Sequence, residues 1–177
     1  MNLIEILREL SNAEGVSGME QNSGAKALEL LREYCPDVYT DQSGNVIGTI
    51  ASSEENAPHV LLDAHLDQVG FIVTAITDEG FIKAGNVGGL DMRIMPAQNV
   101  RVHGKTNIAG VIASVPPHLS GGEEKVMSVT EMLIDTGYSK AELEEIISLG
   151  DRISFDTPFM TLQNDRIASR SMDDRCG

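Results

Sequence analysis

The chain of 177 residues is poor in the features that mark secreted and membrane proteins. Its two cysteines, Cys35 and Cys176, lie far apart and form no CxxC pair, so they make neither a disulfide framework nor a cysteine metal site. No apolar stretch approaches the roughly 20 residues that a membrane span needs. We therefore expect two reduced thiols and no contact with a membrane.

Positive charge is also scarce. The chain has 13 Lys and Arg against 27 Asp and Glu, a formal net charge of -14 at pH 7. Nucleic-acid binding depends on clustered Lys and Arg that release counterions, so a nucleic-acid partner is excluded. The N-terminal sequence MNLIEILREL mixes acidic and apolar residues and lacks the basic and apolar regions of a signal peptide. A cytoplasmic location is the resulting expectation.

Apolar periodicity predicts two helices within the first 35 residues. Ser17 and Glu20 form a possible capping box before the second helix, and Pro36 ends it. Two short strands follow, joined by a turn at residues 43–45. The apolar start of residues 59–67 then predicts a strand buried on both faces of an α/β sheet, with its polar end where such sheets bind ligands.

From Gly70 to about Asp156, short β-rich runs alternate with glycine-containing turns, which predicts a small barrel or sandwich. One helix is expected within this part, from Ser139 to Leu149, with Ser139 and Glu142 as its capping box. Residues 120–125 predict an exposed flexible loop. We accordingly divide the chain into a domain of residues 1–68 and 162–177 and an inserted domain of residues 69–161.

Two motifs with acidic residues could bind metal ions. His65 and Asp67 point to the same face of an extended segment, where the carboxylate can orient a metal-binding imidazole. Asp173 and Asp174 are adjacent, and one carboxylate can bridge two cations about 3.5–4 Å apart. From spacing alone the alternatives stay open, because HxD pairs are often incidental and Arg175 could simply neutralise the acidic pair.

Other candidates are weaker. His103 lies in an alternating strand and His118 follows two prolines, so both are expected at the surface. The glycine-rich residues 85–89 lack the following Lys-Ser/Thr of a phosphate loop. No GxSxG motif is present, which argues against a serine hydrolase.

Several segments in the same order resemble the M42 metallo-aminopeptidases: GVSGME at 15–20, DQSGNVIG at 41–48, DAHLDQVGFIV at 63–73, VIASVPPHL at 111–119, LIDTGYSKAE at 133–142 and MDDRCG at 172–177. The resemblance implies an α/β fold, in which an αβα metallopeptidase catalytic domain, incomplete here, is interrupted by a small β-rich, barrel-like domain. It also implies peptide substrates and assembly into homo-oligomers.

For the site, the resemblance implies that His65 binds a metal, Asp173 bridges two divalent ions (zinc or cobalt), and Asp67 acts as the catalytic residue that orients His65. It further implies a cis peptide bond between Asp173 and Asp174. Gln68 departs from the Glu usual after HxD. Family members continue beyond the position of Gly177 and there supply the general base and the remaining ligands, so we expect this chain alone to be truncated and nearly inactive.

Two other functions remain open. The chain could be a non-catalytic structural or assembly fragment. Whichever function holds, an absent half would leave apolar surface exposed, so we expect this chain to self-associate or to rearrange around that surface. A glycoside hydrolase would instead need two carboxylates roughly 5–9.5 Å apart and no metal. His65 and Asp67 suit metal binding better than that chemistry.

Overall fold

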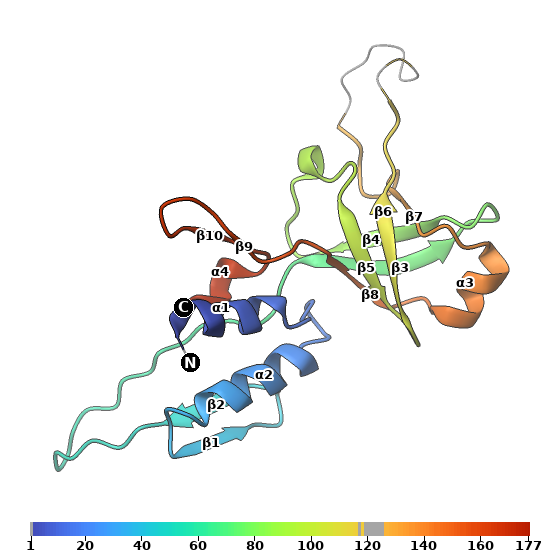
Figure 1. Cartoon of the computed structure of the whole chain (residues 1–177). Helices are drawn as coiled ribbons and strands as arrows, with labels where there is room; N and C mark the ends of the chain where they lie inside the picture. Colours follow the sequence, from blue (N-terminus) through green and yellow to red (C-terminus); the bar gives the residue numbers. More distant parts are fainter. Residues whose placement is uncertain (1, 117, 119–125) are drawn as a thin grey trace. The chain divides into compact units, whose positions relative to one another are not determined.

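The computed structural model describes residues 2–116, 118 and 126–177. Their contacts divide the chain into two compact units, one of Met1–Gln68 with Pro158–Gly177 and the other of Val69–Thr157. Both units are drawn in Figure 1. The expected loop at residues 120–125 lies outside the described residues, and the domain limits at 68 and 162 stay predictions. Within the described residues no helix is long and apolar enough to cross a membrane.

The first unit starts with two helices, as predicted. Helix α1 (Leu3–Asn12) begins with a capping box between Asn2 and Glu5, and α2 (Gln21–Leu31) follows it. Strand β1 (Asp37–Thr40) pairs antiparallel with β2 (Val46–Thr49), and α2 packs against both strands. The Asp41 carboxylate accepts hydrogen bonds from the backbone amides of Ser43 and Asn45, each at 2.9 Å. These local bonds explain why the turn was readable from sequence.

The last twenty residues complete this unit. Strand β9 (Met160–Thr161) pairs antiparallel with β10 (Ile167–Ala168), and the short α4 (Met172–Arg175) packs against α1 (Figure 1). The guanidinium of Arg8 on α1 lies over the ring of Phe159, 4.4 Å from its centroid. The segment that carries Asp173 is thus held against the first helix of the chain.

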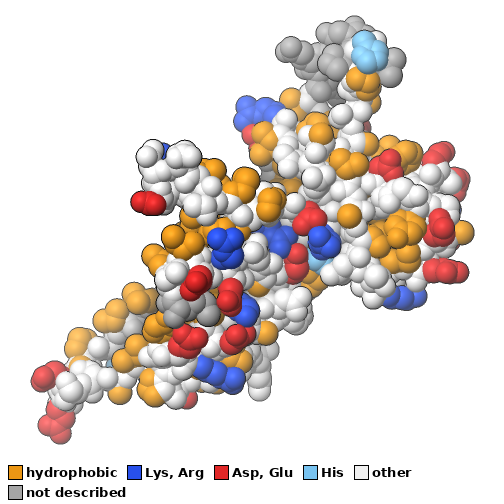
Figure 2. Space-filling view, in the orientation of Figure 1, with side chains coloured by type: hydrophobic (Ala, Val, Ile, Leu, Met, Phe, Trp, Pro, Cys, Tyr) orange, Lys and Arg blue, Asp and Glu red, His pale blue; other side chains and the backbone are white. Residues whose placement is uncertain are grey.

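The predicted strand at residues 59–67 is wrong. This segment has no strand pairing in the structure, and the side chains of Leu61 and Leu62 are 86% and 90% exposed. A strand buried on both faces needs a hydrogen-bonded neighbour, and none of the described residues supplies one there. Figure 1 draws the long connection from β2 to β3, whose later part contains residues 59–67, and Figure 2 shows hydrophobic side chains along this connection. An αβα arrangement therefore stays a prediction from the resemblance.

The second unit is a closed six-stranded barrel, in agreement with the barrel alternative predicted from the sequence. The strand order around it is β3-β4-β7-β6-β5-β8, every pair is antiparallel, and β8 closes on β3. The strands are β3 (Gly70–Ile76), β4 (Ile82–Val87), β5 (Asn99–His103), β6 (Asn107–Ile112), β7 (Leu133–Asp135) and β8 (Arg152–Phe155), with a 3-10 turn at Met92–Ile94.

Apolar side chains from alternate strand positions fill the barrel. Phe71, Ile82, Ile134 and Ile153 are fully buried within one cluster. Helix α3 (Lys140–Ile146) packs against β3 and adds Leu143 to this cluster. The predicted capping box of α3 is confirmed, since Ser139 and Glu142 hydrogen-bond each other's backbone amides. The barrel therefore has a hydrophobic core of its own.

Candidate metal site

His65 lies between two carboxylates of the first unit. Its Nδ1 is 3.1 Å from Oδ1 of Asp67, and its Nε2 is 3.1 Å from Oδ1 of Asp173. Nδ1 also lies 3.2 Å from the backbone oxygen of Asp67. The structure thus brings together the three residues singled out in the sequence, two of them neighbours and one near the C-terminus.

The chemistry of this group fits a divalent metal. A histidine whose one ring nitrogen faces a carboxylate can present the other nitrogen to a metal in a fixed orientation. Two ligands of one tetrahedral zinc lie roughly 3.3–3.6 Å apart, given bond lengths of about 2.0–2.2 Å, and the 3.1 Å between Nε2 and the Asp173 oxygen is slightly below this range. The side chains of His65 and Asp173 are 55% and 96% exposed, so an ion can reach them from solvent.

The surroundings of His65 favour the protonated form of its ring and raise its pKa above that of a free imidazole. Burial lowers the pKa of His65, but hydrogen bonds with Asp173 and Asp67 outweigh this effect and raise the pKa above 6.5. Without a metal, a protonated imidazole ring can donate one N–H to the carboxylate of Asp67 and the other to that of Asp173. A metal that binds Nε2 must displace this proton, so metal and proton compete for the same nitrogen.

Asp67 is fixed by a residue that sequence reasoning assigned to another role. The hydroxyl of Ser17 donates a hydrogen bond to Oδ2 of Asp67. The predicted capping box of Ser17 and Glu20 is therefore wrong: Glu20 is itself the N-cap of α2, and no side-chain hydrogen bond caps this end. Backbone bonds from Gln68 to Gly15 (2.8 Å) and from Ser17 to Gln68 (3.3 Å) hold the two segments side by side.

The segment of Asp173 is joined to the same place through Gln68. The side chain of Gln68 is buried, and its Oε1 accepts a hydrogen bond from the hydroxyl of Ser171. The peptide bond between Asp173 and Asp174 is cis, as the resemblance implied. Gln68, the position that departs from the family pattern, thus links the HxD segment to the acidic pair by its side chain.

Arg175 does not pair with the acidic residues beside it. Its guanidinium is buried and donates to three backbone carbonyl oxygens, those of Leu66, Leu10 and Ala13. Burial, with repulsion from Arg170 as a further cause, lowers the pKa of Arg175 from its ordinary value to about 10. At neutral pH Arg175 remains a cation, and its hydrogen bonds go to backbone carbonyls and not to the carboxylates of Asp173 and Asp174.

The described part of the chain offers an incomplete ligand set. Within it, no group of three or more His, Cys, Asp or Glu side chains is arranged to hold a metal ion. Of these three residues, His65 and Asp173 could ligate the metal, while Asp67 contacts Nδ1 of the imidazole, the nitrogen that does not face Asp173. A metal held at this place needs further ligands besides these two.

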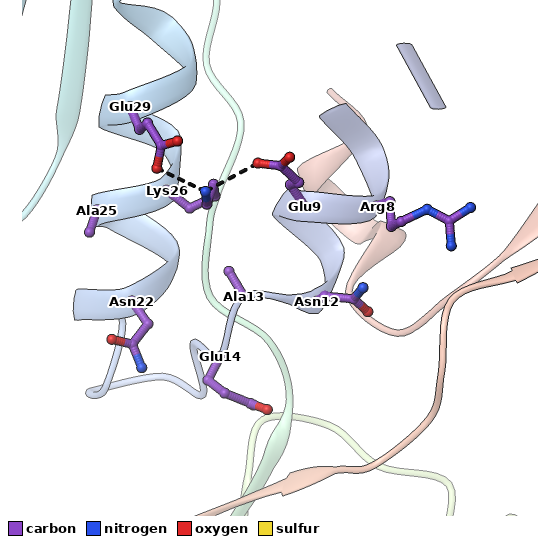
Figure 3. A pocket seen from close by; sticks show the side chains of 9 residues that line it. All are labelled: Arg8, Glu9, Asn12, Ala13, Glu14, Asn22, Ala25, Lys26 and Glu29. Carbon is purple, nitrogen blue, oxygen red and sulfur yellow. Dashed lines mark hydrogen bonds and ion pairs between the residues drawn. The ribbon is translucent and has the colours of Figure 1, made fainter. Parts of the chain in front are cut away.

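A pocket elsewhere in the first unit is lined by an ion-paired lysine and not by the candidate ligands. Residues of α1, α2 and the connection between them line it, among them Lys26, whose Nζ is 2.8 Å from Glu29 and 3.1 Å from Glu9 (Figure 3). Neither His65 nor Asp173 is among its lining residues. The open surface around His65 is therefore not this pocket.

The other candidates contribute nothing to the site. In the barrel, Nε2 of His103 is 2.9 Å from Oγ of Ser154, which accounts for this histidine without a metal. His118 is exposed, as predicted. Cys35 and Cys176 are unpaired thiols, as predicted.

Known proteins are similar to the chain over nearly its whole length. The lysyl aminopeptidase of Pyrococcus furiosus is 30% identical over 184 residues, which cover 97% of this chain and 51% of that protein. The solved structure of an aminopeptidase from Desulfurococcus kamchatkensis matches with a TM-score of 0.91 at 32% identity, covering 98% of this chain and 48% of that one.

A third similar protein is known for its assembly. The Pyrococcus horikoshii TET1 peptidase, described as able to assemble into a tetrahedron or a large octahedral shell, matches with a TM-score of 0.84 at 32% identity, over 98% of this chain and 52% of its own. The chain thus spans about half the length of the curated relatives it matches. The sequence model of the M42 glutamyl aminopeptidase family matches residues 44–177, and the chain belongs to this family.

Proposed function

We propose that the protein to which this chain belongs is a metal-dependent aminopeptidase, which removes N-terminal residues from peptides with a water activated by two divalent ions. The observation that carries the proposal is the position of His65, whose ring nitrogens face Asp67 on one side and Asp173 on the other. Membership in the M42 family supports the peptidase reaction.

Each of the three residues has a distinct task in this proposal. His65 offers Nε2 as a ligand, and Asp67, held by Ser17, fixes the orientation and tautomer of the ring. Asp173 turns Oδ1 toward His65, and its exposed carboxylate would serve as the ligand shared by the two ions. Divalent ions at such a site supply Lewis acidity at the scissile carbonyl and make water more acidic. Imidazole and carboxylate ligands together suit zinc or cobalt.

The 177-residue chain by itself is proposed to be inactive or nearly so. Hydrolysis needs a carboxylate placed to take the proton of the attacking water, in addition to a complete set of metal ligands. The described residues hold two candidate ligands and no third one close by. A protein that covers the other half of the M42 relatives would supply these groups.

Membership in the M42 family also supports a proposal on assembly. The Pyrococcus horikoshii TET1 peptidase can assemble into a tetrahedron or a large octahedral shell, and we propose that the active protein is likewise a homo-oligomer. A cytoplasmic location remains part of the proposal.

A structural or assembly fragment without catalysis is the second candidate, because the exposed residues around Leu61 and Leu62 form an apolar surface that a partner could cover. Under this alternative the chain would bind copies of itself and no metal. Metal dependence separates the two candidates.

The test is hydrolysis of a panel of aminoacyl-p-nitroanilides, with and without a chelator and with added Zn²⁺ or Co²⁺. The longest natural gene product that contains the chain is measured beside the 177-residue chain. We expect activity in the longer protein that is lost in chelator and in the His65→Ala variant. His59→Ala changes an exposed histidine six residues earlier and serves as the matched control, which should keep full activity.

Activity that survives both the chelator and His65→Ala would refute the proposal. A glucan substrate in the same assay tests the glycoside hydrolase alternative, which would show turnover in the presence of chelator. If no natural product extends beyond the chain and the chain is inactive, the assembly alternative is supported instead.

A further inference from the structure

Arg175 joins three segments that carry or support the candidate site. Its Nε donates to the backbone oxygen of Leu66 at 2.8 Å, and its Nη1 donates to the oxygens of Leu10 (2.6 Å) and Ala13 at the C-terminal end of α1. Leu66 is the residue between His65 and Asp67, and Arg175 itself lies two residues after Asp173. One guanidinium therefore connects the segment of Asp173 to the backbone of the HxD motif and to the end of α1.

The neighbouring Arg170 provides a comparison within the same segment. Its guanidinium also binds the end of α1, with Nη2 at 2.7 Å from the oxygen of Asn12 and at 2.7 Å from Oε1 of Glu14. Both arginines hold α1 to the C-terminal residues, and Arg175 in addition donates to the carbonyl of Leu66 in the HxD motif.

The fold makes space for Arg175 at Gly15. A Cβ on Gly15 would lie 2.5 Å from Nη2 of Arg175 and would also overlap the hydroxyl of the fully buried Ser23. Arg175 is 5% exposed, so its guanidinium cannot move into solvent to avoid such an overlap. A buried cation is costly to desolvate, and hydrogen bonds to three carbonyl oxygens offset part of that cost.

We propose that Arg175 is a positioning residue, which sets the separation and orientation of His65 and Asp173 by fixing the carbonyl of Leu66 and the end of α1 to the segment of Asp173. The inference rests on the proposed function, since it concerns the same two ligands. The hydrogen bonds of Arg175 go to backbone carbonyl oxygens and not to the side chains of His65 or Asp173, so its effect on these two residues is indirect.

The shape of the guanidinium explains why this position suits arginine. Nε and Nη1 point in different directions of one rigid plane, so they satisfy Leu66 and the α1 carbonyls at the same time. The ammonium group of a lysine places its donors around a single atom and can satisfy one of these sides well. Arg175→Lys should therefore keep the charge but release one of the two connections.

The experiment compares Arg175→Lys and Arg175→Gln with Arg170→Gln as the matched control, all in the 177-residue chain. Two quantities are measured: the affinity for Co²⁺ by titration calorimetry, and the NMR signals of the His65 ring in the metal-free protein, assigned through the His65→Ala variant. Thermal unfolding of each variant records the loss of stability separately.

We expect both Arg175 variants to bind Co²⁺ about tenfold or more weakly, the range found when a partner that orients a ligand is removed. The His65 ring signals should move in both Arg175 variants. Arg170→Gln should lower the unfolding temperature and leave the affinity and the ring signals as in the unchanged chain. Gly15→Ala, which displaces the guanidinium from the other side, should reproduce the ring shifts if Arg175→Gln does not fold.

Equal losses of affinity in the Arg170 and Arg175 variants would overturn the inference, because Arg175 would then act through stability alone. Unchanged ring signals in Arg175→Lys and Gly15→Ala would overturn it too. If the unchanged chain does not bind Co²⁺, the proposed function fails at this site, while the metal-free ring signals still decide the role of Arg175.

Discussion

Gly15→Ala is a small substitution with a large expected effect. The added Cβ would lie 2.5 Å from Nη2 of Arg175, a separation that real Cβ atoms essentially never show, and still closer to the hydroxyl of Ser23. Both neighbours are buried, so neither can move into solvent without loss. The substitution must shift the backbone of residue 15 or displace the guanidinium.

The magnitude follows from two contributions. Overpacking of a buried site costs about 1–3 kcal/mol. Loss of one charge-assisted hydrogen bond from Arg175 to a carbonyl oxygen costs about 1.5–3 kcal/mol more. We expect the free energy of unfolding of the first unit to fall by about 4 kcal/mol, a large share of the 5–15 kcal/mol typical of a native domain.

Hydrogen exchange measured by mass spectrometry suits this test because it reports on each unit separately. Peptides from α1 and α2 should lose protection in Gly15→Ala, whereas peptides from strands β5 and β6 should not. Gly24→Ala is the control: it lies within α2, and its Cβ would meet only Val46 at an ordinary 3.9 Å. This control should stabilise the unit by about 0.5–1 kcal/mol. Equal protection in Gly15→Ala and the unchanged chain would refute the reasoning.

Three further predictions concern the barrel, helix α3 and the exposed segment. Ile134→Ala removes a fully buried side chain and should cost the barrel about 2–5 kcal/mol in urea unfolding, whereas the exposed Val115→Ala should change it by less than about 0.5 kcal/mol. Ser139→Ala removes the N-cap of α3 and should cost about 1 kcal/mol, with faster amide exchange in α3 alone; uniform exchange changes would contradict this. Leu61→Asp with Leu62→Asp should reduce self-association in sedimentation velocity, and an unchanged concentration dependence would mean that this segment is not the contact surface.

Local signals in the sequence were sufficient for much of the fold. The helices near the N-terminus, the turn at Asp41 and the capping box of Ser139 depend on residues within four positions of each other, and all three were predicted. The barrel followed from the regular alternation of short strands and glycine turns. Periodicity and turn chemistry are local properties, which a single sequence displays directly.

Long-range contacts account for the failures. Residues 59–67 have the composition of a buried strand, but a strand forms only beside a partner, and composition does not show whether one is present. Ser17 and Glu20 have the spacing of a capping box, yet the hydroxyl of Ser17 instead binds Asp67, fifty residues later. A pattern in one segment does not reveal a stronger partner in another.

In the candidate site, too, the local feature was predictable from the sequence and the long-range contacts were not. The HxD spacing indicated that His65 and Asp67 can act together but left an incidental pair open, and the structure places Nδ1 of His65 3.1 Å from Oδ1 of Asp67. The approach of Asp173 could not be derived from spacing and came from the family resemblance. The buried role of Arg175 was not foreseen, because its carbonyl partners in α1 and at Leu66 leave no mark on the sequence.

Calorimetric titration of the metal-stripped 177-residue chain with Zn²⁺ tests the central claim most directly, with His65→Ala, Asp173→Asn and His59→Ala measured beside it. The account predicts that Zn²⁺ binds the unchanged chain and His59→Ala equally, and at least about tenfold more weakly in His65→Ala and Asp173→Asn, because each removes one of the two ligands. Binding of equal strength in all four proteins would contradict it, since the metal would then be held somewhere other than His65 and Asp173.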